Sequence, residues 1–178
     1  MTGTGTEATG LSGVLRLTWV TDQLAHVLEH SQTYEPAGTW TGLACPDHGL
    51  ETGAETDNAI LLRLIRGETA DLIWEAPADF SAEHGQLCRA AIMARQAGRD
   101  DEGERLWKQA QTLWSHAWSA NHQTLQLMQN AGLTRFSPDK PQRWVMASFE
   151  HHCGPHGIEL PHVHNIVITS LTAGTELT

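Results

Sequence analysis

Three histidines near the end of the chain have the residue types and the spacing of a metal-binding group. His162 and His164 begin an apolar segment that is typical of a β-strand. Because side chains alternate along a strand, the two imidazoles project from the same face. His151 follows another predicted strand, Val145 to Phe149, and antiparallel pairing would bring it beside them. Three imidazoles leave open coordination positions, so the pattern predicts a divalent-metal site that binds substrate oxygen atoms.

The metal interpretation has a simpler alternative, because a His-x-His pair on a strand is often exposed or part of a core. Pro161, the apolar run 166–168 and the upstream His151 favour the metal site. The identity of the ion stays open. Imidazole ligands suit Zn, Ni or Mn, whereas phosphoryl transfer often uses Mg or Mn.

The sequence around these histidines resembles the metal motif of HUH endonucleases, and most of all that of MobF-type conjugative relaxases. In that family one histidine is followed by two others, eleven and thirteen residues later, as His151 is followed here by His162 and His164. A second match spans residues 70–81, where the family has an aspartate that orients a metal-binding histidine. Asp71 occupies that position. The resemblance covers about residues 60–178 and implies the N-terminal part of such a domain, or a reduced relative of it.

The resemblance implies a metal-dependent enzyme that nicks single-stranded DNA at a transfer origin and transfers the strand. Its partners would be that DNA and other mobilisation proteins. The catalytic residues it implies are Asp71 and a tyrosine, whose phenoxide attacks the scissile phosphate. Tyr34 is the one tyrosine in the chain, with His26 and His30 as weaker substitutes. The family's tyrosines cluster in and before an early helix, so an aromatic role for Tyr34 in a loop stays open.

The charge of the chain favours other interpretations. The formal net charge is −10, with only 11 lysines and arginines, whereas proteins that bind nucleic acid usually present basic surfaces. One alternative is a degenerate relaxase-like module that binds a metal or a protein partner and cuts nothing. Another is an unrelated metalloenzyme with a three-histidine site.

The periodicity of the sequence predicts an α+β fold. We expect strands over 13–20, 70–75, 144–149 and 162–169, and helices over 21–32, 57–66, 81–98 and 100–130. Residues 35–57 are expected to form a loop. The strands would form an antiparallel sheet with the helices packed on one face and the histidines on the other. A carboxylate on a buried strand is costly unless it is paired, so we expect Asp71 to bond His151.

Length and composition indicate the domain organisation and the cellular location. Residues 1–12 are expected to form a flexible tail and residues 13–178 one domain. No segment has the apolar length of a membrane span, and no membrane partner is predicted. Three scattered cysteines suit a reducing compartment, which favours a cytoplasmic location. Trp107, Trp114 and Trp118 recur at helical spacing and are expected to pack against the sheet.

Overall fold

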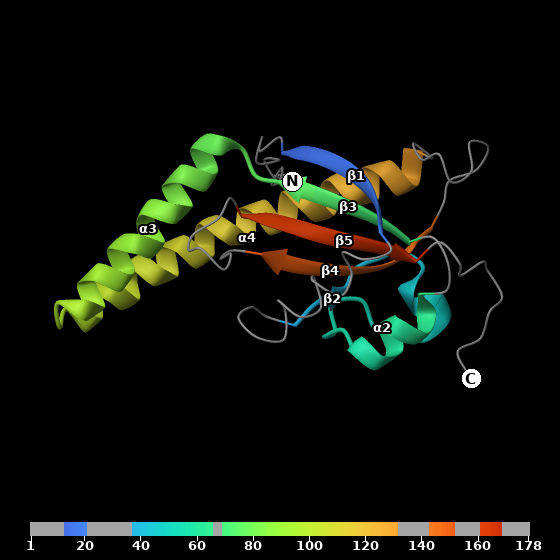
Figure 1. Cartoon of the computed structure of the whole chain (residues 1–178), viewed down its shortest axis with the longest axis horizontal. Helices are drawn as coiled ribbons and strands as arrows, with labels where there is room; N and C mark the ends of the chain where they lie inside the picture. Colours follow the sequence, from blue (N-terminus) through green and yellow to red (C-terminus); the bar gives the residue numbers. More distant parts are fainter. Residues whose placement is uncertain (1–12, 21–36, 66–68, 132–142, 152–160, 169–178) are drawn as a thin grey trace, which may run out of the picture.

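The computed structural model describes residues 13–20, 37–65, 69–131, 143–151 and 161–168 (Figure 1). The predicted tail 1–12 and the predicted helix 21–32, with His26 and His30, lie outside the described residues, and so does Tyr34. Within the described part of the chain, no helix is long and apolar enough to cross a membrane.

Five antiparallel strands form one sheet in the order β1-β3-β5-β4-β2. Four of them confirm the predicted strands: β1 (Val14–Val20), β3 (Thr69–Glu75), β4 (Val145–His151) and β5 (His162–Ile168). The fifth, β2 (Thr39–Trp40), lies inside the predicted loop 35–57 and pairs with β4. Two residues are too few to show strand periodicity, so β2 could not be recognised from the sequence.

One long helix lies along one face of the sheet, and a second long helix packs on the first. α3 (Ala78–Gln96) and α4 (Asp100–Ala131) pack on each other, and Figure 1 shows α4 running behind the strands while α3 diverges from them. α3 starts three residues before the predicted Ser81, directly after Pro77, and its Phe80 side chain packs with the buried Trp74 and Trp114. The helix ends at Gln96, and Gly98, two residues later, has a φ of 71°, a left-handed conformation that favours glycine.

The α4 face of the sheet holds two of the three core clusters among the described residues. One cluster joins Leu125 of α4 to Leu72 and Val167, and another joins Trp114 to Trp74 and Val163. Of the three tryptophans predicted to pack here, Trp114 is buried and Trp118 is partly buried. The prediction is wrong for Trp107, which is exposed and lies against the guanidinium of Arg95 at 5.7 Å. Trp107 belongs to the part of α4 that pairs with α3.

The opposite face is divided between a second core and the histidines. α2 (Asn58–Leu64) and a 3-10 helix, η1 (Cys45–His48), pack there against Phe149, Ile166 and Ile168. Asp57 caps α2, because its Oδ1 accepts hydrogen bonds from the N–H groups of Ala59 and Ile60 at 2.7 and 3.2 Å. The predicted α+β class with an antiparallel sheet is confirmed. The two long helices lie on the predicted face, and the short α2 lies on the histidine side.

Candidate metal centre

Strand pairing brings the three predicted histidines together. β5 lies between β3 and β4, and His151 of β4 is directly opposite His162 of β5. His164 follows two residues later and therefore points to the same face. The strand register agrees with the arrangement predicted from alternation and antiparallel pairing.

The imidazoles are close enough to share one ion. Each of the three offers a ring nitrogen, and these nitrogen atoms all lie within 4.8 Å of one another. The Nε2 atoms of His162 and His164 are 3.1 Å apart. Metal–nitrogen bonds of about 2.1 Å at tetrahedral or octahedral angles separate two ligand nitrogens by roughly 3.0–3.4 Å, so this spacing fits a shared ion. His151 is buried, and the other two are partly exposed, which leaves one side open to a ligand.

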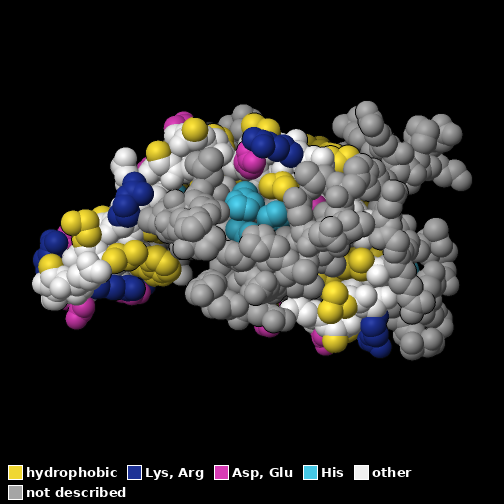
Figure 2. Space-filling view, in the orientation of Figure 1, with side chains coloured by type: hydrophobic (Ala, Val, Ile, Leu, Met, Phe, Trp, Pro, Cys, Tyr) yellow, Lys and Arg dark blue, Asp and Glu magenta, His cyan; other side chains and the backbone are white. Residues whose placement is uncertain are grey.

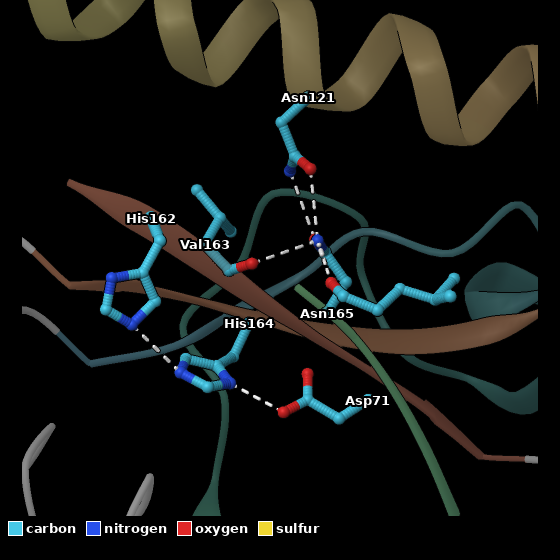
Figure 3. A network of polar contacts seen from close by, with 7 residues as sticks. Asp71, Asn121, His162, Val163, His164 and Asn165 are labelled. Carbon is cyan, nitrogen blue, oxygen red and sulfur yellow. Dashed lines mark hydrogen bonds and ion pairs between the residues drawn. The ribbon is translucent and has the colours of Figure 1, made fainter. Parts of the chain in front are cut away.

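Asp71 lies next to this group, on β3 and on the same face of the sheet. The residue is completely buried, and its Oδ2 accepts a hydrogen bond of 2.6 Å from Nδ1 of His164 (Figure 3). The bond predicted from the sequence was to His151, and the structure corrects that partner to His164. The reason is the strand order: β3 pairs with β5, so Asp71 lies diagonally across from His164, whereas His151 is on the far side of β5.

The carboxylate determines which nitrogen of His164 is available. An ionised carboxylate only accepts hydrogen bonds, so Nδ1 of His164 carries the proton and Nε2 keeps its lone pair. That Nε2 lies 3.1 Å from Nε2 of His162. A metal-binding histidine typically has this kind of outer partner, which fixes the ring and raises the basicity of the ligand nitrogen. The donor set therefore fits a divalent cation bound by His151, His162 and His164.

A charged pair borders the histidines on the same face. Glu75 is directly opposite His162 in the sheet, and Arg16 of β1 is opposite Ile73, the neighbour of His164. Nη2 of Arg16 lies 3.0 Å from Oε2 of Glu75, and the arginine side chain is 64% exposed. Figure 2 shows histidine side chains reaching the surface in the middle of this face, with acidic and basic side chains next to them.

Two further residues of metal-binding type, Cys45 and His48, do not join the centre. Cys45 and His48 lie in η1, and Cys45 is buried in the core cluster on the α2 side. In the part of the chain that the structure describes, His151, His162 and His164 form the one group with metal-binding geometry. Tyr34 lies outside the described residues, so its predicted catalytic role stays a prediction.

Two features of the site were missed by sequence reasoning. Glu75 is four residues after Asp71, so strand alternation alone places it on the same face, and this signal was available. Asn165 is a polar residue at a core-facing position between Val163 and Val167, which also stands out from the alternation. The family resemblance assigns a role to neither residue, which is why neither was selected.

Comparisons with known proteins identify no family for this chain. No protein-family model matches it, and no curated protein matches it. Two solved structures are similar at 14% identity over 87% of this chain: the conjugative relaxase TrwC with oriT DNA in a metal-free form, and TrwC with oriT DNA in a copper-bound form. Their TM-scores are 0.46 and 0.49. The chain spans 55% and 57% of the lengths of these structures. A likeness of this size leaves the function to be argued from the chain's own residues.

Proposed function

We propose that this protein is a relaxase-like, metal-dependent enzyme that nicks single-stranded DNA and transfers the cut strand. The observation that carries the proposal is the convergence of His151, His162 and His164, with Asp71 bonded to His164. These four residues lie at the positions that correspond to the relaxase motif in the sequence. A bound divalent ion would polarise the oxygens of the scissile phosphate and stabilise the charge that develops on them.

We assign the nucleophilic attack to Tyr34 and the orientation of a metal ligand to Asp71. In the proposed reaction the Tyr34 phenolic oxygen, after losing its proton, bonds to phosphorus while the bond from phosphorus to the 3′ oxygen breaks. The leaving 3′ oxygen takes up a proton and becomes a free hydroxyl, and the 5′ end stays on the tyrosine. The covalent link keeps the phosphodiester energy, so the strand can be rejoined by the reverse attack. Asp71 keeps the His164 ring oriented throughout.

A covalent-capture experiment tests this proposal. The protein is incubated with Mn²⁺ and a randomised single-stranded DNA pool, and DNA that remains attached under denaturing conditions is recovered and sequenced. We expect a covalent adduct with a shared sequence, abolished by EDTA, by Tyr34→Phe and by a His162→Ala, His164→Ala double variant. His116→Ala, on the exposed side of α4, is the matched control and should leave the adduct unchanged.

A non-catalytic, relaxase-like binding module is the second candidate. It is favoured by the net charge of −10 and by the single tyrosine of the chain. The same experiment separates the two, because this module would bind the metal and leave no DNA attached. Metal binding together with no adduct from any sequence in the pool would therefore contradict the nicking proposal.

A further inference from the structure

A buried polar network lies directly behind the histidines, on the α4 side of β5 (Figure 3). Its central residue is Asn165, which follows His164 in the chain and is completely buried. The flanking positions on this face, Val163 and Val167, are apolar and equally buried. Burying an amide among valines costs free energy unless its hydrogen bonds are made. The hydrogen-bond partners of Asn165 therefore indicate its role.

Each partner of Asn165 comes from a different element that supplies or supports the site. Its Nδ2 donates to the carbonyl of Leu72, the residue after Asp71 on β3, at 2.8 Å. Its Oδ1 accepts from the hydroxyl of Ser148, on the His151 strand β4, at 2.7 Å. Asn121 of α4 bonds both ends of the amide, at 3.1 and 3.0 Å. Figure 3 shows Asn121 reaching down from the helix to Asn165, with His162, His164 and Asp71 on the other side of the strand.

These bonds join the three strands that carry the four site residues. In the sheet, Asn165 is directly opposite both Leu72 and Ser148, so the amide spans β3, β5 and β4 at one level. A slip of one residue in either pairing would turn the histidines to the α4 face and Asn165 to the solvent face. An apolar side chain at position 165 could pack in several strand registers. The amide of Asn165 makes all its hydrogen bonds in only one register.

We propose that Asn165 is a positioning residue for the metal centre, which it sets through the register of β3, β5 and β4. It has no contact with the ion and acts through the backbone of His164 and the strands on each side. Asn121 and Ser148 take part because they orient the amide. The inference rests on the proposed function only in that the histidines must bind a metal; it requires neither DNA nor nicking.

The test compares Co²⁺ affinity and the visible spectrum of bound Co²⁺ in wild type and Asn165→Leu. We expect about a tenfold rise in the Co²⁺ dissociation constant, as for other outer partners of metal ligands, and a changed spectrum because the ligand geometry changes. Gln129→Leu is the matched control. Gln129 is also a buried amide on α4, and it bonds the N–H groups of Trp144 and Leu43 away from the site. It should lower the unfolding midpoint and leave both Co²⁺ readouts unchanged.

Two further variants separate positioning from general stability. The Asn121→Leu, Asn165→Leu pair removes both amides, so it leaves fewer unpaired groups and should recover stability relative to Asn165→Leu. Its Co²⁺ affinity should stay low. Ser148→Ala, which keeps Asn165, should raise the Co²⁺ dissociation constant by a smaller factor. If Asn165→Leu does not fold, the Co²⁺ affinity of Ser148→Ala tests the positioning role.

The contradicting results are distinct. Wild-type Co²⁺ affinity and spectrum in Asn165→Leu, or in Ser148→Ala where Asn165→Leu is unfolded, would overturn the positioning role and leave the metal centre intact. Equal losses of affinity in Asn165→Leu and Gln129→Leu would overturn it as well, because they would reflect stability alone. A wild-type protein that binds no Co²⁺ would overturn both the inference and the metal-dependent function.

Discussion

His164 donates a hydrogen bond of 2.6 Å from Nδ1 to the fully buried carboxylate of Asp71 on the neighbouring strand. The contact links two segments that are 93 residues apart in the chain. It accounts for a carboxylate inside the sheet, which would otherwise be costly to bury. It also orients Nε2 of His164 toward His162. One hydrogen bond therefore pairs the buried carboxylate and positions a metal-ligand nitrogen.

Asp71→Asn tests this bond. The amide has nearly the same volume, so the fold should be retained, but its negative charge and its fixed role as acceptor are lost. Divalent-metal affinity should fall by about 10- to 100-fold, the usual cost of losing an outer partner of a metal ligand. Asp101→Asn, at an exposed position in the first turn of α4, is the control and should bind the metal like wild type. An Asp71→Asn variant with undiminished affinity would refute the orienting role.

Much of the site was predictable from the sequence because strand alternation and motif spacing are local properties. The shared face of His162 and His164, and the proximity of His151, follow from periodicity and antiparallel pairing. The partner of Asp71 did not follow, because it depends on which strand β3 joins, and periodicity carries no information on strand order. The bonds of Asn165 and Ser148 could not be predicted for the same reason, because they exist only once β3, β5 and β4 are adjacent.

The fold was predicted well where elements are long and poorly where they are short. The core stripe of α4 and the four long strands contain several turns or alternations each, so their patterns are clear. β2 has two residues, and η1 has four, too few for a period to show. Trp107 has the same spacing as the buried tryptophans and is exposed because α4 extends beyond the sheet to pair with α3.

Arg16 and Glu75 give a prediction for DNA binding. The arginine of this ion pair is largely exposed and the glutamate partly, which weakens the pair, so a phosphate can replace the carboxylate on the guanidinium. If single-stranded DNA crosses the histidine face, Arg16→Ala should weaken oligonucleotide binding several-fold. Glu75→Gln should strengthen it, because it frees Arg16 and removes a negative charge. Fluorescence anisotropy with a labelled single strand in EDTA measures both without a contribution from the metal.

The control for this pair is another ion pair of the same kind. Arg99 lies 2.7 Å from Glu102 near the junction of α3 and α4, and both side chains are exposed. Arg99→Ala and Glu102→Gln should leave DNA affinity within a factor of about two, because charges beyond a Debye length are screened. Equal effects from the two pairs would show a response to net charge alone, which would contradict a DNA path over the histidines.

His122 gives a prediction for stability against pH. Burial lowers the pKa of this α4 histidine below its ordinary value of 6.5, although the Trp118 carbonyl and the charge of Glu150 act in the opposite direction. Its ring lies edge-on to Trp118 at 4.8 Å. The unfolded chain takes up the proton first as pH falls below about 6.5, so this residue lowers the free energy of unfolding at acidic pH and has no effect above that range.

Urea unfolding at pH 7.5 and 5.5 measures this effect. The wild type should lose stability between the two values, and His122→Gln should lose less. His116→Gln, at an exposed position on the same helix, should lose as much as the wild type. An unchanged loss in His122→Gln would show that burial of this ring does not contribute to the pH dependence.

Metal binding by the purified chain is the most direct test of the central claim that three histidines form one metal centre. Titration calorimetry with Mn²⁺ and Zn²⁺ would compare the wild type with the His162→Ala, His164→Ala double variant. We expect one ion per chain in the wild type and no binding at this site in the variant, with both proteins folded. A folded wild type that binds neither ion, or a double variant that binds as well as the wild type, would contradict it.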